Sequence, residues 1–312
     1  MRIDCHVHIC AFTPEHGRTT AHVLNSIPFR FMRWRLGIPG SDATTERSLV
    51  QRLADTIDQT EQLDAAVILA FDGIWTRDGQ FDDRNTHLHV TNDFVIELSR
   101  KFPKMLFGAS VHPYRKDAVA EIERCVKAGA KLLKWLPIVQ DFDPADPLCF
   151  PVYEALAHHK LPLLSHTGGE KSLPVRNMAV ADPKLLVPAL ERGVTVIAAH
   201  CGTRSAMGET DFVPEFVRMA QQYENLFGDT AALNLPTRSY AWPTLLKSAA
   251  VRKKLVHGSD WPIPPFPPIS SLGISGLKFW QERNWLRRDV LIKERLGLEN
   301  DYWERAASVL KR

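Results

Sequence analysis

Apolar residues gather in short runs along the chain, and each run is followed by a longer segment in which apolar positions recur at helical spacing. Most of these runs are rich in Val, Ile and Leu and show no strict alternation between apolar and polar positions. This pattern is typical of parallel strands covered on both faces. The predicted strands are Arg2–Ile9, Ala65–Ala70, Met105–Val111, Lys131–Leu136, Leu161–His166, Val194–His200, Leu226–Asp229 and Leu255–Ser259.

The segments between the strands have the periodicity of amphipathic helices that pack one face against a sheet. The predicted helices are Glu46–Leu63, Thr86–Lys101, Asp117–Ala128, Val152–His159, Pro183–Arg192, Val213–Gln222 and Pro243–Lys253. Connections of this length imply right-handed parallel crossovers, and the repeated strand–helix unit predicts one (β/α)8 TIM barrel domain over residues 1–312. A doubly wound open sheet is the alternative, but no GxGxxG motif follows the first strand.

Three segments do not fit the repeating unit. Thr13–Thr44 is long for a connection between a strand and its helix and contains large apolar residues, so we expect a lid-like insertion at about residues 13–44. Trp261–Pro268 contains five prolines and predicts a rigid loop after the last strand. Trp280–Arg312 predicts a helical tail, for which a solvated outer helix is favoured over a binding arm.

The composition excludes several classes of protein. The formal net charge is only +3, from 39 basic and 36 acidic residues, so we expect no nucleic-acid partner. The longest apolar run, Ala65–Phe71, is far short of the ~20 residues that span a bilayer. Met1–Ile9 lacks the basic start and apolar core of a secretory signal, and the five scattered cysteines include no CxxC pair. We therefore expect a cytoplasmic protein with reduced thiols.

Several strands end in residues that can bind a metal or carry a proton. His6 and His8 are two positions apart in the first strand, so both imidazoles point to the same face. His166, His200 and Asp260 follow later strands, and a barrel brings all of these ends to one mouth. Imidazole and carboxylate together suit zinc or another borderline divalent cation. Burying such a group of polar side chains without a cation would be costly, so the set predicts a metal site.

Four motifs carry a family resemblance: Ile-Asp-Cys-His-Val-His, Leu-Leu-Ser-His-Thr-Gly, Ala-Ala-His-Cys-Gly and Gly-Ser-Asp-Trp-Pro. In this order they resemble the amidohydrolase superfamily. The amidohydrolase-related branch, which includes aminocarboxymuconate-semialdehyde decarboxylase-like enzymes, is the most similar. The segment from Gly129 to Pro137 also matches that branch. The resemblance is thinner over residues 13–44 and 262–285, where we expect substrate specificity to lie.

The resemblance implies a ligand set of His6, His8, His166 and Asp260 around one divalent ion, most simply Zn²⁺. His200 would bind a second ion or carry a proton beside a single one. Lys134 would bridge two ions if its amine carries a carboxylate, and otherwise would be an ammonium that binds carboxylates or substrate. Asp4 is expected to support the histidine pair, and Asp229 to orient His200 or an arginine.

A dication at such a site lowers the pKa of water towards ~7, and Asp260 could take the proton and pass it to a leaving group. We expect hydrolysis of an amide, lactone or ester; non-oxidative decarboxylation of an aromatic or enoic acid is the alternative reaction. A non-catalytic barrel is disfavoured because structural zinc sites are closed and rich in Cys and His.

Arginines in the loops after three strands suggest a carboxylate-bearing substrate. They are Arg176, Arg204 and Arg238. Trp135 is a candidate for an apolar wall of the substrate site. The sequence leaves open whether chains pair into a homo-oligomer.

Overall fold

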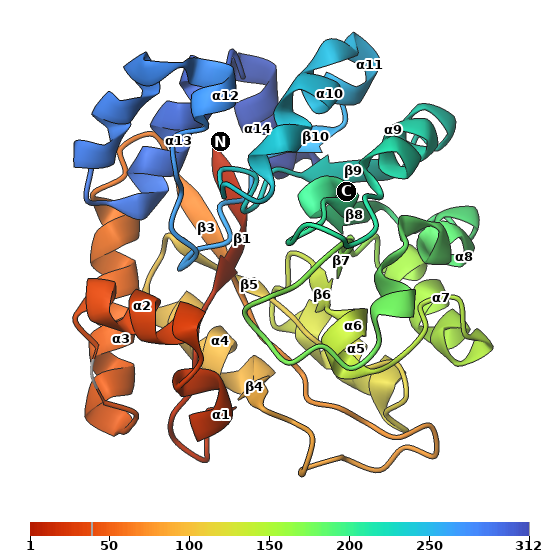
Figure 1. The fold of residues 1–312 in the computed structure, drawn as a ribbon. Helices are drawn as coiled ribbons and strands as arrows, with labels where there is room; N and C mark the ends of the chain where they lie inside the picture. The colour runs from red at the N-terminus through yellow and green to blue at the C-terminus, as the bar shows by residue number, and fades with distance from the viewer. Residues whose placement is uncertain (39, 312) are drawn as a thin grey trace.

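The computed structural model describes residues 1–38 and 40–311, so Pro39 of the predicted lid and Arg312 of the predicted tail lie outside the described residues. Parallel strands form a central barrel surrounded by helices (Figure 1). These strands are β1 (Ile3–His8), β3 (Ala65–Leu69), β5 (Met105–Gly108), β6 (Leu133–Trp135), β7 (Leu163–His166), β8 (Val196–Ala199), β9 (Leu226–Asp229) and β10 (Leu255–Val256). Each lies within a predicted strand, so the strand predictions are confirmed.

Two parallel sheets close the barrel. Their orders are β1-β3-β5 and β10-β9-β8-β7-β6. A parallel bridge between Ala109 and Leu133 joins β5 to β6. On the other side, Val7 of β1 bridges Trp261 after β10, and the Cys5 amide donates to the His257 carbonyl at 3.0 Å. The predicted TIM barrel is confirmed, and the doubly wound alternative is wrong.

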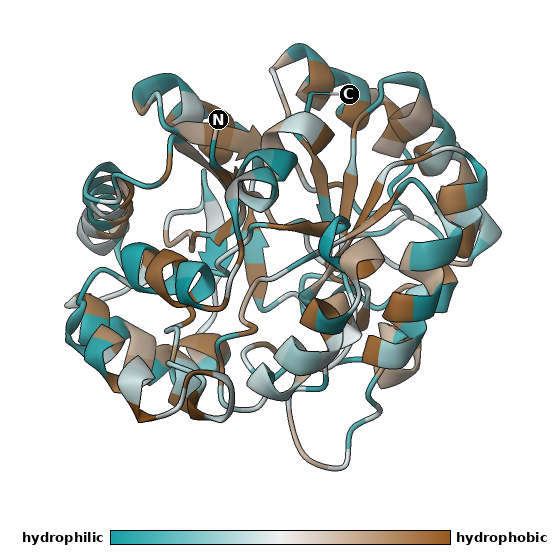
Figure 2. Ribbon diagram, turned by 90° about the horizontal axis from the view of Figure 1, so that it is seen from above, coloured by the Kyte–Doolittle hydropathy of each residue, from teal (hydrophilic) through white to brown (hydrophobic). Residues whose placement is uncertain are grey.

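Burial explains why the strands do not alternate. Every residue of β3 is buried, because one face lies inside the barrel and the other packs against helices. Figure 2 shows apolar residues concentrated on the central strands. Val67, Leu164 and Ile197 belong to a small apolar cluster that also includes residues of α14 (Asn300–Val309). Above this layer the strands end in polar side chains, which places the chemistry at the mouth.

Helices lie in all of the predicted helical segments. They are α3 (Ala43–Asp58), α4 (Asn92–Lys101), α5 (Ala118–Lys127), α7 (Phe150–His158), α8 (Val187–Glu191), α9 (Val213–Gln222), α10 (Trp242–Lys247) and α11 (Ala249–Arg252). Several bounds differ from the prediction: α3 ends at Asp58 rather than Leu63, and residues 183–186 form a 3-10 turn before α8. The predicted helix over residues 86–101 is wrong at its start, where β4 (Leu88–Val90) pairs with β2 (Gly17–Thr19). The predicted helix over residues 243–253 is divided at Ser248, which has an extended backbone and caps α11.

The remaining elements lie at the mouth and at the end of the chain. They are α1 (Ala21–Leu24), α2 (Ile27–Leu36), α6 (Pro137–Gln140), α12 (Ile269–Leu272), α13 (Trp285–Arg295) and several 3-10 turns, including Ile274–Gln281. Residues 262–268 form neither helix nor strand, as the five prolines predict. The insertion after β1 is mostly ordered into β2, α1 and α2 rather than forming a plain loop.

Candidate metal centre

His6, His8 and Asp260 form a compact group at the mouth of the barrel, with one ligand atom from each lying within 4.8 Å of the others. Nε2 of His6 lies 3.0 Å from Nε2 of His8. Oδ1 of Asp260 lies 3.4 Å from Nε2 of His6 and 3.3 Å from Nε2 of His8. These three of the predicted ligands are therefore brought together.

The backbone that carries this group is tightly held. The Asp260 amide donates to the His6 carbonyl at 2.8 Å, which joins the segment after β10 to β1. Oδ1 of Asp4 accepts the amides of His6 and Ser259, at 3.1 and 3.0 Å. Asp4 thus supports the histidine pair, as the sequence predicts. Asp260 itself has a φ of 66°, a left-handed conformation that is uncommon outside glycine and is often found at functional sites.

Asp229, at the end of β9, fixes the orientation of two histidines. Its Oδ2 lies 2.7 Å from Nδ1 of His6, and its Oδ1 accepts the His200 amide at 2.8 Å. Because a carboxylate can only accept, Nδ1 of His6 carries the hydrogen and Nε2 keeps its lone pair. Asp229 therefore orients the His6 imidazole and also holds His200, as predicted, through the His200 backbone amide.

His166 and His200 lie beside the compact group rather than within it. The His200 ring centroid is 5.2 Å from that of His6 and 4.8 Å from that of His166. Nδ1 of His200 is 2.9 Å from the Ala231 carbonyl, so its Nε2 is left as a free acceptor. Nε2 of His166 is 3.2 Å from the Gly169 carbonyl, which leaves Nδ1 as its acceptor. Both rings line the same cavity as His8 and Asp260.

Burial keeps the imidazoles of His6, His166 and His200 neutral. Desolvation, and then the nearby Lys134 charge, lower the pKa of His6 and His166 well below the usual value. Desolvation also lowers the pKa of His200, followed by the Arg238 charge. Burial alone would raise the pKa of Asp260, but the neighbouring His6, His8 and Lys134 outweigh burial and lower it. Neutral imidazoles and a carboxylate are the protonation states that bind divalent metals.

Lys134 lies directly beside the histidines. It is fully buried, and its Nζ lies 3.2 Å from Nε2 of His6. Desolvation lowers its pKa to about 8, although the charges of Asp229, Asp260 and Glu170 act in the opposite direction. A substantial fraction of this amine is therefore neutral near pH 8, which is the form that could take up a carboxylate.

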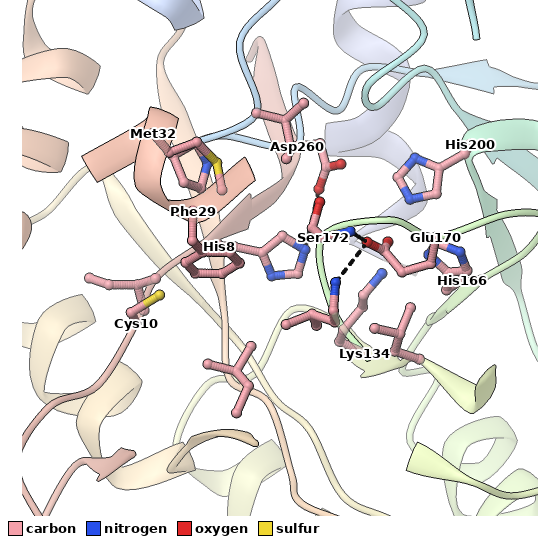
Figure 3. A pocket seen from close by; sticks show the side chains of 16 residues that line it. His8, Cys10, Phe29, Met32, Lys134, His166, Glu170, Ser172, His200 and Asp260 are labelled. Atoms are coloured by element: carbon pink, nitrogen blue, oxygen red, sulfur yellow. Dashed lines mark hydrogen bonds and ion pairs between the residues drawn. The ribbon is translucent and has the colours of Figure 1, made fainter. Parts of the chain in front are cut away.

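A cavity of about 70 Å³ opens beside these groups. Its polar side includes Lys134, His166, His200, Asp260 and Glu170, while Phe29 and Met32 from α2 belong to the apolar side (Figure 3). The sequence singled out neither Glu170 nor Ser172, although both line the cavity close behind the His-Thr-Gly-Gly motif. The insertion after β1 thus contributes the apolar wall, which fits its prediction as a lid.

No arginine within residues 1–38 and 40–311 lines this cavity. Arg176 is exposed and lies 3.6 Å from Asp141, while the Arg204 guanidinium stacks over Tyr240 at 4.5 Å. Arg238 is buried, but it donates to the Thr203 hydroxyl at 2.7 Å and to the Gly169 carbonyl at 2.6 Å, so it ties two loops together. The expected arginine rim therefore does not face the cavity.

Trp135 also lies away from the cavity. It follows Lys134 in β6, so its side chain leaves the opposite face of the strand. The indole is fully buried against Phe142 and Tyr153 and donates to the Val111 carbonyl at 2.7 Å. Trp135 therefore belongs to the layer between barrel and helices, and the sequence interpretation of it as a substrate wall is corrected.

The donor atoms fit a divalent cation. Nε2 of His6 carries a lone pair, yet it lies 3.4 Å from Oδ1 of Asp260, which is itself an acceptor. Two acceptors this close are unfavourable unless positive charge lies beside them, which the Lys134 amine, 3.2 Å from Nε2 of His6, or a bound metal ion would supply. Two imidazole nitrogens and one carboxylate oxygen, with two further histidines beside them, suit zinc and other borderline metals.

Comparison with known proteins agrees with this fold. The sequence model of the amidohydrolase family matches residues 3–277. No curated relative matches the sequence. Among solved structures, an uncharacterized TIM-barrel protein from Bordetella bronchiseptica is 16% identical with a TM-score of 0.67, over 100% of this chain and 99% of that chain.

Two further structures are similar in fold. A putative 2-pyrone-4,6-dicarboxylic acid hydrolase from Pseudomonas putida is 14% identical with a TM-score of 0.59, over 99% of this chain and 97% of that chain. A 5-carboxyvanillate decarboxylase from Novosphingobium aromaticivorans, complexed with manganese, is 12% identical with a TM-score of 0.55, over 100% and 96%.

The TIM barrel and the matched sequence model define the class: the chain belongs to the amidohydrolase family of metal-dependent enzymes. In the part of the chain that the structure describes, no helix is both long and apolar enough to cross a membrane.

Proposed function

We propose that the protein is a metal-dependent hydrolase that cleaves an ester, lactone or amide bond of a small molecule. One observation carries the proposal: Nε2 of His6, Nε2 of His8 and Oδ1 of Asp260 lie within the reach of one ion at the barrel mouth. Zinc is the proposed metal because the donors are imidazole and carboxylate, and manganese is the alternative because a structurally similar decarboxylase carries it.

When bound, the ion would supply Lewis acidity and make water nucleophilic at neutral pH. Asp260 then has the role of general base and acid: its lowered pKa keeps it ionised, so it can take a proton from water and return it to the leaving group. His200 presents a free Nε2 to the cavity, where it can accept a proton or bind a second ion. Lys134 would bridge two ions only if it is carboxylated.

A metal-dependent non-oxidative decarboxylase of an aromatic or enoic acid is the second candidate. The buried amine of Lys134 favours it, since a cation that lines the cavity can hold a substrate carboxylate. The likeness to the 5-carboxyvanillate decarboxylase also supports this candidate. Because the three arginines lie outside the cavity, we propose that any substrate carboxylate is held by Lys134 or by the ion.

Elemental analysis of the purified protein, combined with product analysis, tests the proposal. We expect at least one metal atom per chain in the wild type and loss of metal in His8→Ala. A count near two that falls in Lys134→Ala would indicate a carboxylated lysine, whereas a count near one in both would indicate a single ion. Lactone or ester cleavage that Asp260→Asn abolishes would support the hydrolase, and CO2 release without addition of water would support the decarboxylase. No uptake of zinc or manganese by the wild type would overturn both candidates.

A further inference from the structure

A carboxylate outside the predicted ligand set lies on the polar side of the cavity. Glu170 follows β7 and lines the cavity together with Lys134, His166 and His200 (Figure 3). It is not a member of the compact group of possible ligands, which contains only His6, His8 and Asp260 among the described residues. Its position therefore calls for a role other than completing that group.

The loop that carries Glu170 is rigid. Gly168 has a φ of 81°, and a Cβ at Gly169 would overlap the Ser205 amide and the Glu209 carboxylate. The Gly169 amide donates to the Thr203 carbonyl at 3.0 Å, and its carbonyl accepts from Arg238 at 2.6 Å. The backbone just before Glu170 is thus pinned to the neighbouring loop, so the carboxylate starts from a fixed point.

Only one oxygen of the Glu170 carboxylate accepts hydrogen bonds from the described residues. The amides of Ser172 and Leu173 both donate to its Oε1. It forms no ion pair within 4.0 Å among the described residues, although its charge acts from farther away on the buried Lys134 and Arg238. Its second oxygen is therefore left to interact with whatever enters the cavity. An acceptor fixed on one oxygen and unpaired on the other is ready to receive a hydrogen bond at little entropic cost.

The opposite side of the cavity is apolar. Phe29 and Met32 from α2 face the polar groups across the cavity (Figure 3), and Leu173 and Ile263 also line it. An occupant of this space would place an apolar body against α2 and a polar group near Glu170. A bare carboxylate at that end would meet like charge.

We propose that Glu170 is a substrate-positioning residue that accepts a hydrogen bond from a donor group of the substrate, such as an ammonium, an amide N–H or a hydroxyl. The substrate is then a small molecule with an apolar body and a donor at this end, and any carboxylate it carries lies towards Lys134. The inference rests on the proposed function for the identity of the site, but its test reads binding rather than turnover.

Three ligands of equal chain length separate charge from shape: butylamine, butanol and butyrate. Their binding to the purified protein with its native metal is measured by ligand-observed NMR titration, in wild type, Glu170→Gln and Glu170→Lys. Glu191→Gln, an exposed glutamate at the end of α8, is the matched control. Metal content and thermal unfolding are recorded for each variant.

In Glu170→Gln we expect butylamine to bind about 10-fold more weakly, as the loss of a charge-assisted hydrogen bond implies, and butanol about 3-fold more weakly. Butyrate should bind more tightly in Glu170→Lys than in the wild type. A merely structural role for Glu170 would not invert this preference. Equal affinities for all three ligands in wild type and Glu170→Gln would overturn the inference. Loss of metal in Glu170→Gln would also overturn it, by making Glu170 a ligand. Failure to hydrolyse any ester would overturn the proposed function and leave these binding outcomes readable.

Discussion

Replacing Asp229 with asparagine should weaken metal binding without unfolding the protein. Oδ1 of Asp229 accepts the amides of His200 and Ala231, so an asparagine must keep its oxygen there and present its NH2 group to Nδ1 of His6. Nδ1 would then have to accept, and the hydrogen would move to Nε2 of His6. The lone pair that faces His8 and Asp260 would be lost.

The size of this effect on metal affinity follows from the hydrogen bond between His6 and Asp229, whose donor and acceptor are exchanged by the substitution. A buried hydrogen bond to a charged group contributes about 1.5–3 kcal/mol, which corresponds to a roughly 10- to 150-fold change in an equilibrium constant. Burial raises the pKa of Asp229, so the neutral amide escapes a desolvation cost that the carboxylate bears. We therefore expect metal affinity to fall by this factor while the thermal unfolding midpoint of the metal-free protein changes little.

The assay is competition for zinc against a chelator of known affinity, with His6→Ala as the upper limit of the loss. Asp211→Asn is the matched control, because Asp211 accepts from the Tyr240 hydroxyl and the Val213 amide and touches no imidazole. An Asp229→Asn protein that binds zinc as tightly as the wild type would refute the tautomer argument.

Three other predictions concern the apolar wall of the cavity, the loop contacts of Arg238, and His112, a buried histidine 2.9 Å from the Gln140 carbonyl. Phe29→Ala should lower the free energy of unfolding by about 3 kcal/mol and raise kcat/KM for bulkier esters. Phe31→Ala, on the exposed side of α2, should change neither quantity. Equal effects of the two substitutions would contradict the assignment of this segment as a lid. Arg238→Gln should lower the unfolding free energy by about 2 kcal/mol in denaturant titrations, since two loop contacts are lost. Burial lowers the pKa of His112 to about 4, so the stability it contributes is present above pH 6.5 and is lost as the pH falls towards 4. Between pH 7 and 5 the loss should be about 2 kcal/mol, and His112→Gln should flatten that dependence in urea titrations.

The sequence predicted the barrel well because most of its strands are short runs rich in Val, Ile and Leu. Short apolar-rich runs with His6, His8, His166 and Asp260 in or just after them locate both the strands and the mouth. The start of α4 was missed because Leu88 and Val90 have helical spacing only together with later residues, and their pairing partner lies in the distant β2. Local periodicity carries no information about such a partner.

Side-chain direction accounts for most of the remaining errors at the site. The sequence places Arg238 in the loop after β9, but it cannot show that the guanidinium binds Thr203 and the Gly169 carbonyl. The wrong assignment of Trp135 was avoidable. If Lys134 faces the barrel interior, alternation along the strand directs the side chain of the next residue outward. Glu170 gave no signal, since one glutamate beyond a Gly-Gly pair resembles any exposed loop residue until the cavity is seen.

The seam at which the barrel closes has a consequence for how the site is assembled. His8 belongs to the first strand and Asp260 follows the last, so they are on the order of 250 residues apart, and bringing the ends of so long a loop together costs about 5 kcal/mol of chain entropy. During synthesis the imidazole pair emerges at once, whereas the carboxylate arrives only after most of the barrel has been made. An ion bound by residues on both sides of the seam would link the first strand to be synthesised with the last. The enzyme would then be able to hold its metal firmly only once the chain that surrounds it is nearly finished.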